Sequence, residues 1–157
     1  MSSLEQLYQQ VILDHSRRRT GEAAIDGLPF SSHQVNPTCG DEVTLGVDVD
    51  PDGQLTRVAW QGDGCAISQA SLSMMNELIE GASNDELRSM YSAMDQMMHS
   101  RGKGVPDEVL DRLGDAAVLE GTSKFANRVK CALLGWYALR DSLAQAGIDI
   151  VEEENHG

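Results

Sequence analysis

Apolar residues recur every three or four positions near the N-terminus, which is the spacing of one face of a helix. The residues of this face are Leu4, Leu7, Tyr8, Val11 and Ile12. Ser3 and Gln6 have the spacing of a capping box, in which two side chains satisfy backbone N–H groups at a helix start. The pattern therefore predicts an N-terminal helix that docks on the rest of the molecule.

The pattern changes to strict alternation between residues 43 and 61. Its apolar positions are Val43, Leu45, Val47 and Val49, and then Val58 and Trp60 beyond a turn-forming run at 50–53. A period of two is typical of strands with one buried face, so we expect two antiparallel strands in a small sheet with one covered face. The arginines at 17–19 and the polar run that follows them to Thr38 are predicted to be an irregular connection. The arginines at 17–19 are interpreted as a solvated helix end or a contact for an acidic partner.

Helical spacing returns after residue 65 and predicts three longer helices. The first ends at Gly81, the second begins at a capping box of Ser83 and Glu86, and the third begins near Ser123. The side chains that the last helix is expected to bury are Phe125, Val129, Ala132, Trp136, Leu139 and Leu143. Gly and Pro residues break the stretch 101–121 and leave a short helix around 108–113. Strands followed by helices indicate a single α+β domain over residues 1–148, with an acidic, flexible tail at 149–157.

Composition narrows the class of protein. The 157 residues are 41% apolar and 24% charged, which is ordinary for a globular domain. A formal net charge of −13 argues against nucleic acid or an anionic membrane as partner, because both are bound through clustered Lys and Arg. The sequence has no apolar run of about 20 residues and no signal-peptide pattern at its start, so we expect a cytoplasmic protein.

The three cysteines are too few, and odd in number, for a disulfide framework. Cys39 precedes the first predicted strand, Cys65 lies at a glycine-flanked junction between strand and helix, and Cys131 lies early in the last helix. Ligands and nucleophiles concentrate at such element ends, whereas a structural cysteine replaces an apolar residue within a periodic pattern. These positions favour a metal site or a nucleophile over three unrelated buried cysteines.

Neighbouring residues extend this candidate site. If the chain is extended at Cys39, the period of two directs Asp41 to the same side, so this pair can grip one ion. Backbone N–H groups at a helix start stabilise a Cys65 thiolate. Arg128 precedes Cys131 by three residues on one helix face and is either the cation that offsets the negative ligands or a solvated helix residue. A sulfur-rich site with one carboxylate suits zinc or iron, and its carboxylate is the more exchangeable ligand.

Three spaced motifs in this order carry a resemblance to a known family. They are Asn36-Pro37-Thr38-Cys39-Gly40-Asp41, Gly62-Asp63-Gly64-Cys65-Ala66-Ile67-Ser68 and Ser123-Lys124-Phe125-Ala126-Asn127-Arg128-Val129-Lys130-Cys131. The chain resembles the SufU branch of the IscU/NifU-N iron–sulfur cluster assembly family. IscU-type members have a histidine directly before the third cysteine and a Leu-Pro-Pro-Val-Lys motif upstream of it. Lys130 stands in place of that histidine here, and the motif is absent.

The resemblance implies a SufE/NifU-like (IscU) fold, an α+β fold in which several helices pack on one face of a small antiparallel sheet of about three strands. It also implies a zinc ion bound by Cys39, Asp41, Cys65 and Cys131. It further implies that Cys39 accepts sulfur from a SufS-type cysteine desulfurase, with Arg128 as the supporting cation, and that downstream iron–sulfur assembly proteins are partners. The alternative is a scaffold on which the same four residues hold iron or a transient [2Fe–2S] cluster. A purely structural zinc domain is the third possibility.

Overall fold

The structure is a computed structural model that describes residues 3–151. Its elements in chain order are α1 (Ser3–Arg18), β1 (Phe30–Asn36), β2 (Asp41–Val49), β3 (Leu55–Asp63), α2 (Ala66–Ile79), α3 (Asn84–Met98), α4 (Asp107–Leu110), the 3₁₀ helix η1 (Gly114–Lys124) and α5 (Ala126–Gln145). The predicted α+β class and the capping box of Ser83 and Glu86 at the start of α3 are both confirmed.

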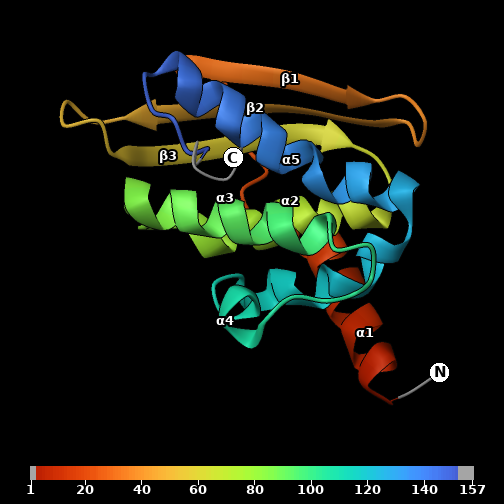
Figure 1. Cartoon of the computed structure of the whole chain (residues 1–157). Helices are drawn as coiled ribbons and strands as arrows, with labels where there is room; N and C mark the ends of the chain where they lie inside the picture. The colour runs from red at the N-terminus through yellow and green to blue at the C-terminus, as the bar shows by residue number, and fades with distance from the viewer. Residues whose placement is uncertain (1–2, 152–157) are drawn as a thin grey trace.

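The sheet has the order β1-β2-β3, and both pairs are antiparallel. Helix α5 packs across β1 and β2, and the other helices lie on this same side of the sheet (Figure 1). Val43, Leu45 and Val47 of β2 are fully buried under the helices, as their alternation predicts, and Trp60 of β3 pairs with Leu45. The sheet therefore forms one layer and the helices cover its apolar face.

The first strand corrects the prediction for the polar run before Thr38. Residues 30–36 form β1, an edge strand that pairs with β2 along its whole length. Its two buried residues are polar, Ser32 and Asn36, and Val35 is 52% exposed. Because apolar residues do not mark the inward positions, this strand has no alternating apolar pattern in the sequence.

The last helix begins later than predicted and does not bury all of its expected face. Residues 114–124 form η1, so α5 begins at Ala126 rather than near Ser123. Trp136, Leu139 and Leu143 are buried as predicted, but Phe125 is 51% exposed. This residue precedes the helix in an extended conformation, which takes its ring off the apolar stripe.

The N-terminal helix is less buried than its apolar stripe predicts. Leu4 and Leu7 are both more than half exposed, whereas Val11 and Ile12 pack partly against the core. Helix α1 therefore docks through its C-terminal half. In the described range, 3–151, no helix has the length and apolar character needed to cross a membrane.

The packed part of the chain continues past residue 148, where the sequence placed the domain boundary. Ile150 is 1% exposed, and the Arg88 Nε donates a hydrogen bond of 2.8 Å to the carbonyl oxygen of Asp149. The remainder of the predicted tail, residues 152–157, lies outside the described residues.

A buried histidine connects α1 to two other helices by hydrogen bonds. The His15 side chain is 1% exposed; its Nδ1 lies 3.0 Å from Ser73 Oγ in α2 and its Nε2 lies 2.9 Å from Asp115 Oδ2 in η1. Both ring nitrogens are thus hydrogen-bonded to side chains far away in the sequence. Because the ring is buried, these bonds help to fix α1 in place.

We expect His15→Phe to lower the free energy of unfolding by about 2 kcal/mol, because a ring of similar size loses two hydrogen bonds. Urea unfolding followed by circular dichroism measures the change. His33→Phe is the matched control, since His33 is exposed and its one hydrogen bond reaches the exposed Glu42. Equal midpoints for the two variants would show that the His15 contacts do not hold α1.

Candidate metal centre

Segments far apart in the sequence meet at one end of the sheet. The β1–β2 turn, the junction between β3 and α2, and the start of α5 all lie at this end (Figure 1). Cys39 lies in the turn, Asp41 is the first residue of β2, and Cys131 lies in the second turn of α5. One ligand atom from each of these three residues lies within 4.8 Å of the others. Asp41 is fully buried and Cys131 is 1% exposed, whereas Cys39 is half-buried.

Cys65 lies beside this group, but it is not among the residues whose ligand atoms all lie within 4.8 Å of one another. It occupies the N-cap position of α2 with an extended backbone, and its own N–H donates a hydrogen bond of 2.8 Å to Asp41 Oδ1. Its sulfur is 4.0 Å from Ser68 Oγ. The structure thus brings three of the four predicted ligands together and places the fourth next to them.

The ionisable groups affect one another strongly. Burial raises the pKa of Cys131 well above its usual range, and hydrogen bonds with Asp41, Cys39 and Cys65 raise it further. Burial also raises the pKa of Asp41, but hydrogen bonds from the Cys131 thiol and the Cys65 backbone outweigh it, so that pKa lies below its ordinary value. Asp41 is therefore a buried carboxylate held by thiol and N–H donors.

Two polar side chains that the sequence analysis did not single out hold the carboxylate. Asn36, at the end of β1, donates from Nδ2 to Asp41 Oδ2 at 3.3 Å and to Cys131 Sγ at 3.5 Å. Ser68 donates from Oγ to Asp41 Oδ1 at 3.2 Å. In the sequence, Asn36 stands out only as part of the motif at 36–41 and Ser68 only as part of the motif at 62–68. In metal sites, hydrogen bonds of this kind orient the ligands.

Asn36→Ala is expected to weaken zinc binding by roughly tenfold to a hundredfold, the usual effect of losing a residue that orients ligands. The expected cause is the loss of two hydrogen bonds that fix Asp41 and Cys131. A competition titration against a chromophoric chelator measures the affinity. Gln34→Ala is the control, because Gln34 lies on the same strand and bonds to Ser32 instead. Equal affinities in the two variants would rule out a positioning role for Asn36.

The structure places the predicted supporting cation against an aromatic ring. Arg128 is exposed, and its guanidinium carbon lies 4.9 Å from the centre of the Phe125 ring. Within residues 3–151, no ion pair or hydrogen bond joins Arg128 to the four candidate ligands, so its role at the site stays a prediction.

The arginines at 17–19 are not simply a solvated helix end. Arg18 donates two hydrogen bonds to the Glu77 carboxylate, at 3.0 and 2.9 Å. Arg19 lies over the Trp60 ring at 4.9 Å and donates a 2.8 Å hydrogen bond to the carbonyl oxygen of Gly62. Two of the three arginines therefore attach the end of α1 to α2 and β3.

The donor set fits a metal ion. Ligands of a tetrahedral zinc ion lie about 3–4 Å apart, since Zn–S bonds are about 2.3 Å long, so Cys39, Asp41 and Cys131 need only small shifts. A second group, His15, Glu77 and Asp115, has equally close ligand atoms. There Arg18 already neutralises Glu77, so that group is an ion-pair network.

Comparison with known proteins assigns the family. The family model described as the NifU-like N-terminal domain matches residues 7–132, which is most of the chain. The chain belongs to the NifU-like N-terminal domain family. The three ligand-bearing segments of this NifU-like domain all lie within the matched range.

Two relatives of this NifU-like domain have different names at similar identity. One, 35% identical over 93% of the chain and 88% of the relative, is the iron–sulfur cluster assembly scaffold protein IscU of Streptococcus pyogenes serotype M1. The other, 37% identical over 92% of the chain and 94% of the relative, is the zinc-dependent sulfurtransferase SufU of Bacillus subtilis strain 168. The resemblance to the IscU/SufU family is thereby confirmed, and overall similarity does not separate the two branches.

Solved structures of the family share the fold. The N-terminal NifU-like protein of Brucella abortus superposes with a TM-score of 0.78 at 26% identity, covering 93% of this chain and 98% of the other. A putative scaffold protein for the SUF system from Fervidobacterium islandicum AW-1 gives 0.69 at 31% identity, covering 90% and 99%. The three-stranded sheet with helices on one side is therefore the family fold.

Proposed function

We propose that this chain accepts sulfur on Cys39 from a SufS-type cysteine desulfurase, with a zinc ion held by Cys39, Asp41, Cys65 and Cys131. The observation that carries the proposal is the close group of Cys39, Asp41 and Cys131, in which Cys39 alone lies on a turn and is only half-buried. One relative is named a zinc-dependent sulfurtransferase and another an iron–sulfur cluster assembly scaffold. Both names support a role in handling sulfur for iron–sulfur cluster assembly.

The turn makes Cys39 the thiol that a partner can reach. Gly40 follows it with a φ of +71°, a conformation that favours glycine, and Pro37 precedes it at the end of β1. Cys131, in contrast, is buried between α5 and the sheet, with its Sγ 3.4 Å from the carbonyl oxygen of Asn127. Motion of the turn changes the position of Cys39 without disturbing the core.

The transfer step is a thiol–disulfide type of exchange. The Cys39 thiolate attacks the outer sulfur of the persulfide on the desulfurase cysteine. A new bond forms between Cys39 Sγ and that sulfur, the sulfur–sulfur bond on the desulfurase breaks, and its cysteine leaves as a thiolate. A bound zinc ion would keep its thiol ligands deprotonated at neutral pH. Asn36 and Ser68 hold Asp41 in place throughout.

Assembly of a [2Fe–2S] cluster on the same four residues is the second candidate, favoured by the relative named IscU at 35% identity. In that case the cluster is cargo that the chain builds and releases. Lys130 in place of a histidine before Cys131, and the absence of the Leu-Pro-Pro-Val-Lys motif of IscU-type members, favour sulfur transfer over this role.

A desulfurase assay with the purified chain separates the two candidates. Zinc-loaded protein should increase alanine formation from cysteine by a SufS-type desulfurase, and metal analysis should find one zinc per chain. Anaerobic incubation with iron and sulfide tests for a chromophore that survives desalting and passes to an apo-ferredoxin. Cluster transfer without stimulation of the desulfurase would replace the proposal with the scaffold function.

A further inference from the structure

A chain of hydrogen bonds connects the end of α1 to the buried carboxylate of the candidate metal centre. Arg19, which follows α1 directly, donates from Nη1 to Gln69 Oε1. Gln69 in turn donates from Nε2 to Ser68 Oγ at 3.4 Å, and Ser68 donates from Oγ to Asp41 Oδ1 at 3.2 Å. The three residues beyond the arginine are all buried. Water therefore has little access to the groups that lie between this cation and the carboxylate.

The direction of the hydrogen bonds is fixed where the chain begins. A guanidinium only donates, so the amide oxygen of Gln69 must face Arg19 and the amide nitrogen then faces Ser68. Ser68 Oγ accepts from that nitrogen, which leaves its own proton for Asp41 Oδ1 at 3.2 Å or for the carbonyl oxygen of Cys65 at 3.0 Å. A Gln69 amide rotated by 180° would turn its oxygen towards Ser68 and draw this proton away from Asp41.

Arg19 is itself held in place by three other groups. Its Nη2 donates a hydrogen bond of 2.8 Å to the carbonyl oxygen of Gly62 and forms an ion pair with Glu22. Its guanidinium carbon lies 4.9 Å from the centre of the Trp60 ring. The backbone of Arg19 has a φ of +50°, a conformation that residues with a side chain adopt infrequently. A guanidinium fixed in this way can orient the amide of Gln69.

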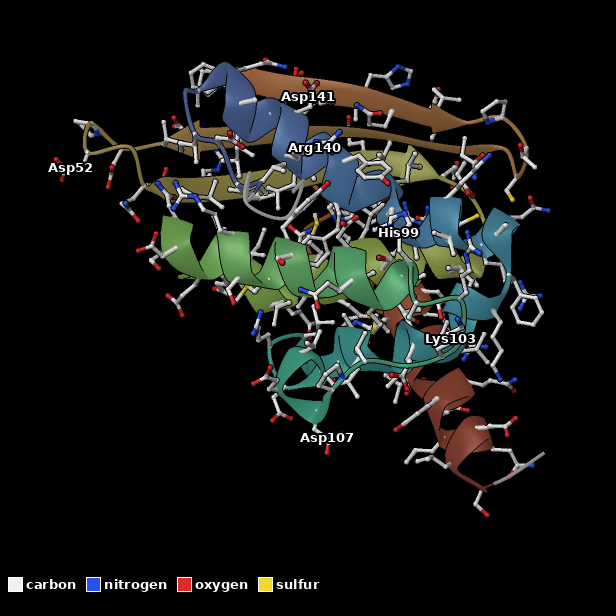
Figure 2. The ribbon with its side chains drawn as sticks, in the orientation of Figure 1. Asp52, His99, Lys103, Asp107, Arg140 and Asp141 are labelled. Carbon is white, nitrogen blue, oxygen red and sulfur yellow. The ribbon has the colours of Figure 1, made fainter. Side chains whose placement is uncertain are left out.

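The other cations of the chain have no comparable route to the centre. In the described range, 3–151, hydrogen bonds connect no other Lys or Arg to a candidate ligand. Arg128, the cation expected from the sequence, lies over Phe125 instead. Figure 2 shows Lys103 on the loop after α3 and Arg140 farther along α5. Arg19 is thus the cation that the fold links to the buried carboxylate.

We propose that Arg19 is a positioning residue for the candidate metal centre and acts through Gln69 and Ser68. By fixing the amide of Gln69, Arg19 keeps the Ser68 hydroxyl directed at Asp41 Oδ1. A carboxylate that is held by an oriented donor binds a metal ion with less loss of freedom, which is how residues around the ligands raise metal affinity. The proposal rests on the zinc ligands of the proposed function but not on sulfur transfer.

Arg19→Gln is expected to weaken zinc binding roughly tenfold, the low end of the range for residues that orient ligands. Arg18→Gln is the matched control, because Arg18 also attaches the end of α1 to α2 but bonds to Glu77. Both variants lose one positive charge and one attachment of α1, so urea unfolding should show a lower midpoint for both. Only Arg19→Gln should lose affinity in competition with a chromophoric chelator. Equal affinities in the two variants would overturn the proposal.

Gln69→Glu tests the direction of the hydrogen bonds, since glutamate has the shape of glutamine but presents only oxygens. It keeps a partner for Arg19 and turns an acceptor towards Ser68. Zinc affinity should therefore fall as far as it does in Ser68→Ala. Once Ser68 is alanine, Arg19→Gln should weaken binding no further, because the two residues act in one chain. A full-sized effect of Arg19→Gln in the Ser68→Ala background would overturn the proposal.

The backbone N–H of Cys65 gives a measurement that needs no zinc. It donates at 2.8 Å to Asp41 Oδ1, the oxygen that also accepts from Ser68. In NMR spectra of the full chain prepared without zinc, the Cys65 amide should shift in Arg19→Gln and not in Arg18→Gln. An unmoved Cys65 amide in Arg19→Gln would overturn the proposal.

These measurements separate the proposal from the proposed function. If the unaltered chain bound no zinc, the proposed function would fail, whereas the Cys65 amide would still report on the link from Arg19 to Asp41. If Arg19→Gln did not fold, Gln69→Glu would carry the test, because it retains Arg19. In that variant an unchanged Cys65 amide together with unchanged zinc affinity would overturn the proposal.

Discussion

Replacing Cys39 with alanine is expected to abolish the stimulation of cysteine turnover by a SufS-type desulfurase while the fold stays intact. The substitution removes the only candidate ligand that lies on a turn, and with it the atom that accepts sulfur. The core is unaffected because Cys39 is not part of it. Alanine formation measures the turnover, and circular dichroism with thermal unfolding checks the fold.

Thr38→Ala is the matched control for this variant. Thr38 is the neighbouring residue on the same turn and is exposed, so its loss should leave stimulation unchanged. Stimulation of the normal size by Cys39→Ala would remove the sulfur-acceptor role. Loss of stimulation in both variants would show that the shape of the turn, rather than the thiol, is what the desulfurase needs.

Replacing Gly64 with alanine is expected to damage the candidate metal centre and the stability together. An added Cβ would lie 2.3 Å from Asp41 Oδ1 and 2.6 Å from Ser68 Oγ, and Asp41 is buried and held by several hydrogen bonds. Such overpacking costs about 1–3 kcal/mol, and displacing a ligand lowers zinc affinity by tenfold or more. Urea unfolding and chelator competition measure the two effects.

Gly121→Ala provides the comparison for this substitution. A Cβ at Gly121 meets no atom within 4 Å, so neither stability nor zinc affinity should change appreciably. If Gly64→Ala bound zinc as tightly as Gly121→Ala, the position of the Asp41 carboxylate would have no effect on zinc affinity.

The parts of the fold that follow from apolar periodicity were predictable. The alternation at 43–49 marks β2 because the inward side chains of Val43, Leu45 and Val47 are apolar, and the buried stripe of α5 around Trp136 is likewise apolar. Strand β1 was not predictable in this way, since Ser32 and Asn36 take its buried positions. Phe125 was expected to be buried but is exposed, because an apolar stripe does not show where a helix begins.

The site was predictable only in part. Local spacing paired Cys39 with Asp41, but the approach of Cys131 depends on the packing of α5 against β1 and β2, which no spacing in the sequence reveals. The resemblance to the IscU/SufU family supplied that link. The contact of Asn36 with Asp41 follows from their pairing in the hairpin, and its contact with Cys131 follows from the packing of α5, so both emerge only from the fold.

Mass spectrometry of the chain after incubation with a cysteine desulfurase and cysteine tests the sulfur-acceptor role most directly. The zinc-loaded protein is separated from the desulfurase under non-reducing conditions and digested, and each cysteine-containing peptide is weighed. We expect the added mass of one sulfur atom on the peptide that contains Cys39. Added sulfur found only on Cys65 or Cys131, or on none of the three, would contradict the sulfur-acceptor role of Cys39.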